Sequence, residues 1–287
     1  MNGSIARAAE GEAAGLGHRD FAIIAELMHR HTGIHLPEAK RVMVEGRLAK
    51  RLRLLGLGSF SDYRALIESD EGEEERHRMV AALTTNVTRF NREPHHFGTL
   101  QQEVLPRLAA HVRGGGRLRL WSAACSSGEE PYSIALAVLA AWPEAADLDI
   151  RVLATDINAE MVARGREGTY SGSALASIPP AARERWFEPA GQDLWRAGRA
   201  LSSLVVFRVM NLIGDWPMRG RFDAIFCRNV AIYFDTPSQE RLWARLADAT
   251  APGGCLFIGH SERIVGPAAR LFASAGITTY RRGEATS

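Results

Sequence analysis

Residues 118–133, LRLWSAACSSGEEPYS, combine a short apolar strand, a turn of small residues and a helix that begins with two acids. In an open α/β fold, a nucleoside cofactor binds at the turn after the first strand. A dinucleotide site needs several glycines there, but this turn has Gly128 alone and contains no Lys or Arg. Glu129 and Glu130 would repel phosphates and attract a positively charged nucleoside. S-adenosylmethionine, with its sulfonium and ammonium groups, fits this pattern.

The two glutamates have different expected roles. Ser127 and Glu130 match a capping box, in which the hydroxyl accepts a hydrogen bond from the N3 amide and the glutamate reaches back to the cap. Glu130 is therefore interpreted as a structural residue. Glu129 is not needed for the box, and we predict that it faces the cofactor.

Polar residues also follow the next three predicted strands. Asp156 ends the second strand, where a carboxylate can accept hydrogen bonds from ribose hydroxyls; alternatively, it caps the helix that begins near Asn158. After the third strand, Asn211 can bond an adenine edge while Leu212 packs on the ring. The fourth strand leads to three further candidates, two over the cofactor crevice and one on the following loop: Arg228, Asn229 and Tyr233.

The segment before the first strand, TTNVTRFNREPHHF, holds more polar and aromatic side chains than a linker needs. His95 and His96 could suggest a metal, but we expect adjacent histidines to point in different directions, and no third ligand is apparent. We therefore predict no metal site and assign both histidines to a helix N-terminus. The polar residues that mark this segment as more than a linker are Asn86, Thr88, Arg92 and Glu93.

The pattern of elements predicts an all-helical domain followed by an α/β domain with a mostly parallel sheet. We expect a disordered N-terminus over 1–17, helices over 18–84, a linker that contributes to the cofactor site over 85–98, and the α/β domain over 99–287. Residues 168–204 are too long for a plain crossover and predict an inserted subdomain. Strands are predicted at 118–121, 151–155, 205–210, 224–227, 255–259 and 277–281, and helices at 131–141, 159–166, 238–250 and 268–275.

A basic row is predicted on the helix over residues 40–55. Lys40, Arg47 and Arg51 line up beside an apolar stripe, and Lys50 lies on the flank. Such a face is commonly just solvated. The alternative is that these four residues dock onto an acidic protein surface.

Composition limits the other function classes. The net charge of +2 gives no reason to expect a nucleic-acid partner, and no apolar run approaches the length of a membrane span. Three scattered cysteines have no metal-site spacing and suit a reducing compartment. We expect a cytoplasmic protein that is not embedded in a membrane.

Six segments in order resemble the chemotaxis receptor methyltransferases, the CheR family: TTNVTRFNRE, WSAACSSGEEPYS, ATDIN, FRVMNL, FCRNVAIYFD and GGCLFIGHSE. The resemblance covers residues 18–282. It implies a class I S-adenosylmethionine-dependent methyltransferase fold, with a Rossmann-like sheet, a final antiparallel strand, a small inserted β-subdomain and an all-α N-terminal domain. Carried over by motif, the cofactor contacts would be Asn86, Thr88, Arg92, Glu129, Asp156, Asn211, Leu212, Arg228 and Asn229. Asn91, beside Arg92, departs from the family pattern, in which a second Phe is usual.

The resemblance implies methyl transfer from S-adenosylmethionine to glutamate carboxylates of chemotaxis receptors, giving γ-methyl esters and S-adenosylhomocysteine. A glutamate is ionised at pH 7, so no general base is needed. Arg92 would orient the substrate carboxylate or the methionine end of the cofactor, and Tyr233 would line the transfer site. The partner would be the cytoplasmic helical domain of methyl-accepting chemotaxis receptors, and we expect a monomeric enzyme.

Three alternative function classes fit the sequence less well. A nucleic-acid methyltransferase predicts an Asn/Asp-Pro-Pro-aromatic loop after the fourth strand, where this chain has Arg-Asn-Val-Ala. A catalytically silent sensor or adaptor predicts loss of Arg92 or Tyr233, and both are present. A nicotinamide dehydrogenase is disfavoured by the turn with one glycine. In some family members the insertion binds a peptide at the receptor's C-terminus, but the short segment 188–195 predicts an enzyme that is independent of this tether.

Overall fold

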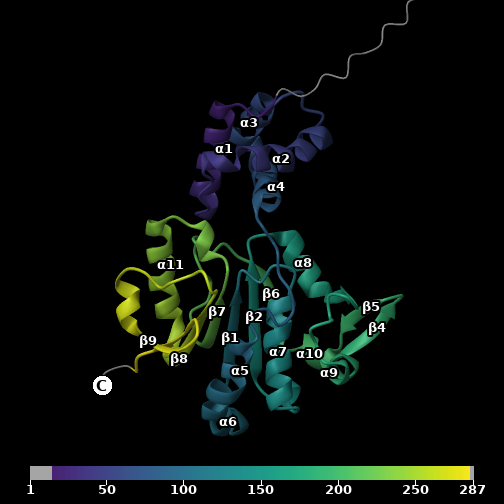
Figure 1. Cartoon of the computed structure of the whole chain (residues 1–287), viewed down its shortest axis with the longest axis vertical. Helices are drawn as coiled ribbons and strands as arrows, with labels where there is room; N and C mark the ends of the chain where they lie inside the picture. Colours follow the sequence, from purple (N-terminus) through teal and green to yellow (C-terminus); the bar gives the residue numbers. More distant parts are fainter. Residues whose placement is uncertain (1–14, 285–287) are drawn as a thin grey trace, which may run out of the picture. The chain divides into compact units, whose positions relative to one another are not determined.

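The computed structural model describes residues 15–284, and the chain divides between Thr84 and Thr85 into two compact units, each described by itself (Figure 1). The first unit is all-helical, as predicted. Its core includes Phe21 and Ile24 of the first helix and Leu48 of the second. The elements are α1 (His18–Thr32), η1 (Glu38–Lys40), α2 (Arg41–Leu55), α3 (Phe60–Glu68), η2 (Asp70–Gly72) and α4 (Glu73–Leu83).

Most of the predicted disordered N-terminus, residues 1–14, lies outside the described residues. The part that is described is packed. Leu16 is buried, and its carbonyl accepts a hydrogen bond of 2.8 Å from Nη1 of Arg41 in α2. The prediction of disorder is therefore wrong at Leu16. Although the surrounding stretch is rich in Gly and Ala, the apolar side chain of Leu16 is buried.

The second unit contains a seven-stranded sheet in the order β6-β2-β1-β7-β8-β10-β9. Strands β6, β2, β1, β7 and β8 are mutually parallel, whereas β10 is antiparallel to both of its neighbours. The class I methyltransferase type of fold, with an antiparallel strand after the parallel ones, is thus confirmed. The strands are β1 (Leu118–Ala123), β2 (Ile150–Asp156), β6 (Val205–Val209), β7 (Phe222–Cys227), β8 (Thr250–Ile258), β9 (Phe272–Gly276) and β10 (Thr279–Arg282).

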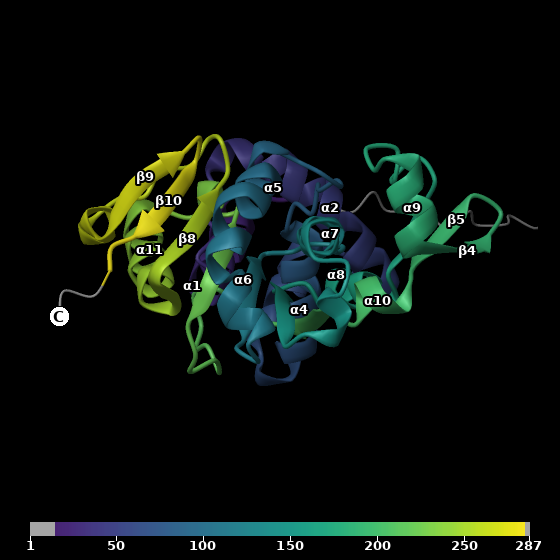
Figure 2. The same cartoon turned by 90° about the horizontal axis from the view of Figure 1, so that it is seen from below.

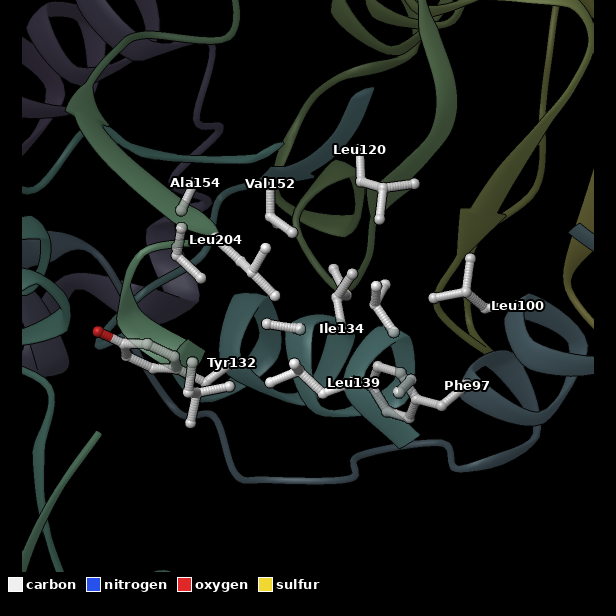
Figure 3. Close-up of a cluster of buried hydrophobic side chains, with 14 of the residues drawn as sticks. Phe97, Leu100, Leu120, Tyr132, Ile134, Leu139, Val152, Ala154 and Leu204 are labelled. Carbon is white, nitrogen blue, oxygen red and sulfur yellow. The ribbon is translucent and has the colours of Figure 1, made fainter. Parts of the chain in front are cut away.

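Helices cover the sheet and close its core. Helix α7 packs on β1, β2 and β6, helix α8 on β2 and β6, and helix α11 on β8. Figure 3 shows Ile134 and Leu139 of α7 packed among apolar side chains of the strands, including Leu120 and Val152. The helices and helical turns of this part are α5 (His95–Thr99), the π-helical turn η3 (Leu100–Val104), α6 (Leu105–Arg113), α7 (Glu129–Ala141), η4 (Ala145–Asp147), α8 (Ala159–Glu167), η5 (Ala231–Tyr233) and α11 (Thr236–Ala249).

The predicted helix over residues 268–275 is wrong. The segment forms the short 3-10 helix η6 (Pro267–Leu271) and then strand β9, which pairs with β10. This pairing supplies backbone hydrogen bonds that a local sequence pattern does not reveal. The last described elements are therefore the paired strands β9 and β10 rather than a helix followed by one strand.

The inserted subdomain between β2 and β6 is confirmed. It contains a three-stranded antiparallel sheet in the order β3-β5-β4. In both views of the molecule this sheet and the C-terminal hairpin lie at opposite ends of the second unit (Figure 2). Its elements are β3 (Thr169–Ser171), α9 (Pro180–Trp186), β4 (Phe187–Gly191), β5 (Leu194–Ala197) and α10 (Arg199–Ser202). Across residues 15–284, every helix is too short or too polar to cross a bilayer.

Candidate active site

The turn between β1 and α7 is tightly wound. Ala124, Ser126 and Gly128 all have positive φ values, of 65°, 50° and 100°. A Cβ on Gly128 would lie 2.7 Å from the Tyr170 hydroxyl oxygen and 2.9 Å from Cα of Gly165. Glycine is therefore required here by close packing, in addition to its backbone conformation.

The predicted capping box is wrong. The Ser127 hydroxyl donates to Oε2 of Glu129 at 2.7 Å instead of capping the helix with Glu130. Glu130 is directed toward the strands, where Oε1 accepts from the Ser122 hydroxyl at 2.7 Å and Oε2 accepts from Nη1 of Arg228 at 2.9 Å. Glu130 therefore belongs to a buried ion pair.

Of the two adjacent glutamates, Glu129 is the one that stays at the turn, as predicted. Burial raises its pKa, while its hydrogen bond with Ser127 opposes that rise. The side chain is half-buried at the first position of α7. Its contact with the cofactor stays a prediction.

Asp156 lies at the end of β2, against the same turn. Its Oδ2 accepts from the Ser126 amide at 2.8 Å, and Oδ1 accepts from the Asn158 amide at 2.9 Å. The cap of α8 is Asn158, whose Oδ1 accepts from the amides of Glu160 at 3.0 Å and Met161 at 3.3 Å, so the alternative that Asp156 caps the helix is wrong. Burial raises the pKa of Asp156, and its backbone hydrogen bonds oppose the rise. An oxygen with one donor keeps a lone pair that can accept from a hydroxyl.

The end of β6 adjoins Asp156. The Met210 amide donates to the Asp156 carbonyl at 2.9 Å, which brings the following residues to the same edge of the sheet. Leu212 is buried, and Asn211 is half-buried with Oδ1 accepting from the Ile213 amide at 3.1 Å. These positions are compatible with the predicted adenine contacts.

The segment before α5 contacts the turn between β1 and α7. The Ser126 hydroxyl donates to the carbonyl of Asn86 at 2.9 Å, and Nη1 of Arg92 donates to the carbonyl of Val87 at 3.1 Å. Thr88 and Arg92 are both half-buried. The linker therefore contacts the turn that follows β1 through Asn86, and Arg92 is bonded to the residue after Asn86.

Asn91, the departure from the family pattern, is accommodated locally. Its φ of 53° is in the left-handed region, which Asn adopts more readily than most residues. Its amide donates to the Ser133 hydroxyl oxygen at 3.1 Å, and its side-chain nitrogen donates to the carbonyl of Ser177 at 2.8 Å. Asn91 thus connects the segment that carries Arg92 to α7 and to the inserted subdomain.

Arg228 is buried, with only 1% of its side chain exposed. Its guanidinium lies 2.9 Å from Oε2 of Glu130 and 3.2 Å from Oε2 of Glu93, and Nη2 also donates to the carbonyl of Arg92. The predicted cofactor contact of Arg228 stays a prediction. What the contacts establish is that Arg228 joins β7, α7 and the linker.

The two carboxylates beside Arg228 differ in their other partners. Burial of Glu93 opposes ionisation, but hydrogen bonds from His260 and the charge of Arg228 lower the pKa of Glu93 to about 2. The pKa of Glu130 is raised by burial, with Arg228 and Ser122 opposing the rise. The positive charge of one guanidinium thus favours the ionised form of two neighbouring carboxylates.

The prediction that the side chains of His95 and His96 point in different directions is wrong. Their ring centroids are 4.2 Å apart, and Nε2 of each approaches Oγ1 of Thr278, at 3.4 Å for His95 and 2.8 Å for His96. Together with Glu93, they offer possible metal-ligand atoms that all lie within 4.8 Å of one another. The fixed positive charge of Arg228, 3.2 Å from the Glu93 carboxylate, opposes a cation at this cluster.

His96 itself is neutral at physiological pH. Burial, together with the charge of Arg228, lowers its pKa to about 3. The absence of a metal from this cluster therefore stays a prediction, supported by the charge of Arg228 beside Glu93.

The loop after β7 is held by a residue that the sequence interpretation missed. Glu262 accepts hydrogen bonds from the amides of Asn229 at 2.8 Å, Val230 at 2.9 Å and Ala231 at 2.7 Å. Asn229 has a φ of 58°, and Tyr233, two residues after Ala231, is half-buried. The only available signal was the acid in the segment GHSE, which carries no local indication of its partners.

The residues assigned to the cofactor converge because β6, β2, β1 and β7 are adjacent and parallel, so their carboxyl ends share one edge of the sheet. The linker adds its residues from the side, through the contact with Ser126. The predicted site residues that follow these strand ends or belong to the adjoining linker are Asn86, Thr88, Arg92, Glu129, Asp156, Asn211, Leu212, Arg228, Asn229 and Tyr233.

The predicted basic row belongs to the helical unit, and its four residues do not share one exposed face. Nη1 of Arg47 donates at 2.9 Å to the carbonyls of both Leu83 and Thr84, at the end of α4. Arg51 is ion-paired with Glu75, a buried acid, through Nε at 2.9 Å. These two arginines therefore do not form an exposed row.

The exposed face of α2 is different from the predicted one. Lys40, at its N-cap, and Lys50 are exposed, as is Arg53. Two large apolar side chains accompany them, Val42 at 75% and Leu54 at 65% exposure.

Comparison with known proteins agrees with both units. Residues 86–281 match the family model described as CheR methyltransferase, SAM binding domain, and residues 19–84 match CheR methyltransferase, all-alpha domain. A probable chemotaxis protein methyltransferase of Rhizobium etli is 47% identical over 89% of this chain and 96% of its own. Chemotaxis protein methyltransferases of Klebsiella aerogenes and Escherichia coli are 42% and 39% identical, over 92% and 94% of this chain and 90% and 92% of theirs. The chain belongs to the CheR family of S-adenosylmethionine-dependent chemotaxis methyltransferases.

Proposed function

We propose that this methyltransferase esterifies glutamate side chains of chemotaxis receptors, using S-adenosylmethionine and releasing S-adenosylhomocysteine. The observation that carries the proposal is the edge formed by four parallel strand ends, with Arg92 held beside it through the Asn86–Ser126 contact. Acidic groups at that edge suit a cationic cofactor, and an arginine suits a carboxylate substrate.

The reaction needs no proton transfer. A carboxylate oxygen of the receptor glutamate forms a bond to the methyl carbon while the carbon–sulfur bond breaks, and the electron pair stays on sulfur. The sulfonium becomes a neutral thioether. The task of the protein is to align oxygen, carbon and sulfur and to exclude water, which can supply much of the rate enhancement.

Each group has a role in this alignment. Asp156 would accept from the ribose hydroxyls, Asn211 would bond the adenine edge, and Glu129 would face the positively charged part of the cofactor. Arg92 would orient the substrate carboxylate or the methionine carboxylate. Tyr233 would line the path of the methyl group, and no metal takes part. Thr88, Leu212, Arg228 and Asn229 are proposed as the further cofactor contacts.

For receptor docking we propose the exposed face of α2 that contains Lys40, Lys50 and Arg53, in place of the row that included Arg47 and Arg51. The proposed partner is the cytoplasmic helical domain of a chemotaxis receptor, which presents an acidic surface, so the enzyme would act in the cytoplasm. Rim charges of this kind mainly set association rate and salt dependence. Reversing Lys50 and Arg53 to Glu should raise the Michaelis constant for receptor and leave cofactor affinity unchanged. Identical kinetics at low and high salt would remove this face from docking.

We also propose that the enzyme works as a monomer without a receptor tether. The turn between β4 and β5 has only Gln192 and Asp193 between the paired residues Gly191 and Leu194. Edge strand β4 also contains Pro189, which lacks an amide for strand addition. Removing the C-terminal residues of a receptor should leave its methylation rate unchanged, and calorimetric binding of the tether peptide would contradict the proposal.

The deciding experiment uses methyl-labelled S-adenosylmethionine with membranes that contain candidate receptors. We expect label on a receptor-sized band, lost on mild alkaline treatment because esters hydrolyse and amines do not. A receptor with its methylation-region glutamates changed to Ala is the matched control and should stay unlabelled. Alkali-stable label, or label on nucleic acid, would reject glutamate esterification.

A further inference from the structure

Glu262 lies in the segment after β8, outside the groups assigned to cofactor or substrate. Its side chain is buried, with 5% of the residue exposed. In addition to the amides of Asn229, Val230 and Ala231, it accepts a hydrogen bond from the Gly259 amide at 2.6 Å. Four backbone donors thus converge on one carboxylate.

The donors are divided equally between the two oxygens. Oε1 accepts from Val230 and Ala231, and Oε2 accepts from Asn229 and Gly259. A carboxylate can accept at both oxygens, whereas a carboxamide has one oxygen and one donor group. Replacing Glu262 with Gln therefore sets an NH2 group against two backbone N–H groups in either orientation.

The loop backbone is shaped around this carboxylate. Asn229 has a left-handed φ, which together with its neighbours turns successive N–H groups toward one point, as in an anion-binding nest. A Cβ on Gly259 would lie 2.4 Å from Nδ2 and 2.9 Å from the backbone nitrogen of Asn229, so the two segments are in close contact. Here the anion of the nest is supplied by the chain itself.

We propose that Glu262 is a positioning residue for methyl transfer: it fixes the backbone of residues 229–231 and thereby Asn229 and the nearby Tyr233. The inference rests on the proposed function, because it assigns Asn229 to the cofactor and Tyr233 to the transfer site. Glu262 acts through the loop, since its oxygens are occupied by the four amides.

The test is Glu262→Gln in the full chain, with Glu167→Gln as the matched control. Glu167 is exposed at the end of α8 and lies outside the site, so its variant should behave like the native enzyme. Hydrogen exchange followed by mass spectrometry would report the amides of residues 229–231. Methyl transfer to receptor membranes and calorimetry with S-adenosylmethionine would be measured at a temperature at which all variants are folded.

We expect amide exchange at residues 229–231 to accelerate in Glu262→Gln. We expect kcat to fall by about 10-fold to 100-fold, as for a small displacement of aligned groups, with the Michaelis constant for receptor unchanged. Cofactor affinity should weaken by about threefold to tenfold, which corresponds to the partial loss of one hydrogen bond from Asn229. If Glu262→Gln fails to fold, Glu262→Asp is the second variant; it keeps the charge but reaches fewer amides, and the same three readouts should move in the same directions.

Unchanged exchange at residues 229–231 in the folded variant would overturn the proposal, because the loop would then not depend on Glu262. Faster exchange with native kcat and native cofactor affinity would also overturn it, since the role would be structural only. If the native enzyme fails to methylate receptors, the proposed function fails. The exchange and cofactor-binding measurements would still show separately whether Glu262 positions the loop.

Discussion

Replacing Glu93 with Gln tests the buried charge cluster around Arg228. Glu93 is 12% exposed, and its pKa is lowered from 4.5 to about 2. At 1.36 kcal/mol for each pKa unit, that fall corresponds to roughly 3 kcal/mol of stability at pH 7. Because the pKa of Glu93 is lower in the folded state, the stabilisation is fully present above pH 4.5. It is lost as the pH falls through 2.

The assay is urea unfolding followed by tryptophan fluorescence. All six tryptophans lie after residue 84, so the signal reports the unit that contains Glu93. The free-energy difference between native protein and Glu93→Gln should be roughly 3 kcal/mol at pH 7 and narrow by roughly 1 kcal/mol at pH 4. Glu103→Gln is the matched control, because Glu103 forms an ion pair with Arg281 at 3.2 Å whose side chains are 49% and 36% exposed. It should cost less than about 1 kcal/mol.

Two results would refute this reasoning about Glu93. The first is a cost for Glu93→Gln no greater than that for Glu103→Gln, which would mean that the buried cluster stabilises no more than a surface pair. The second is a free-energy difference that widens on acidification, because a lowered folded-state pKa requires the opposite sign.

Three further predictions concern the site and the helical unit. Asp156→Ala should weaken S-adenosylmethionine binding by about 1.5–3 kcal/mol in calorimetry through loss of hydrogen bonds to a charged group, and unchanged affinity would remove Asp156 from the ribose site. Arg92→Ala and Tyr233→Phe should reduce methyl transfer while the melting temperature stays near that of the native protein; normal rates in both would mean that the transfer site lies elsewhere. Arg51→Met should lower the free energy of unfolding by about 3–5 kcal/mol because it leaves buried Glu75 without its cation, whereas exposed Lys50→Met should lower it by less than about 0.5 kcal/mol. Circular dichroism and hydrogen exchange of α4 would measure both losses. Equal small losses would mean that the pair of Arg51 with Glu75 contributes no more than a surface charge.

The sequence predicted the fold and the edge of the sheet where the candidate residues meet. Alternating strands and helices require a parallel sheet, and parallel strands bring residues such as Asp156, Asn211 and Asn229 to one edge. These inferences depend only on the position of each residue relative to the end of its own strand. They needed no knowledge of which side chains are partners across the fold.

The errors arose where a distant partner overrode a local pattern. Ser127 and Glu130 have capping-box spacing, but Glu130 pairs with Arg228, 98 residues away. Arg51 lies at the spacing of an exposed basic row, but its partner Glu75 is 24 residues away. Leaving a buried charge without its partner costs more than losing one hydrogen bond at a helix end, so tertiary contacts determined both orientations.

The same long-range pairing explains how the site can be acidic without being unstable. A cationic cofactor favours carboxylates at the edge of the sheet, but closely spaced carboxylates repel one another and oppose folding. Arg228 approaches Glu130 and Glu93 from inside the protein and offsets their charge there. In the proposed function, Glu129 and Asp156 are then left to face the cofactor, while the buried cluster fixes the segment that carries Arg92. On this account Arg228, besides its proposed cofactor contact, holds the acidic edge together, and its loss should impair folding as well as affinity.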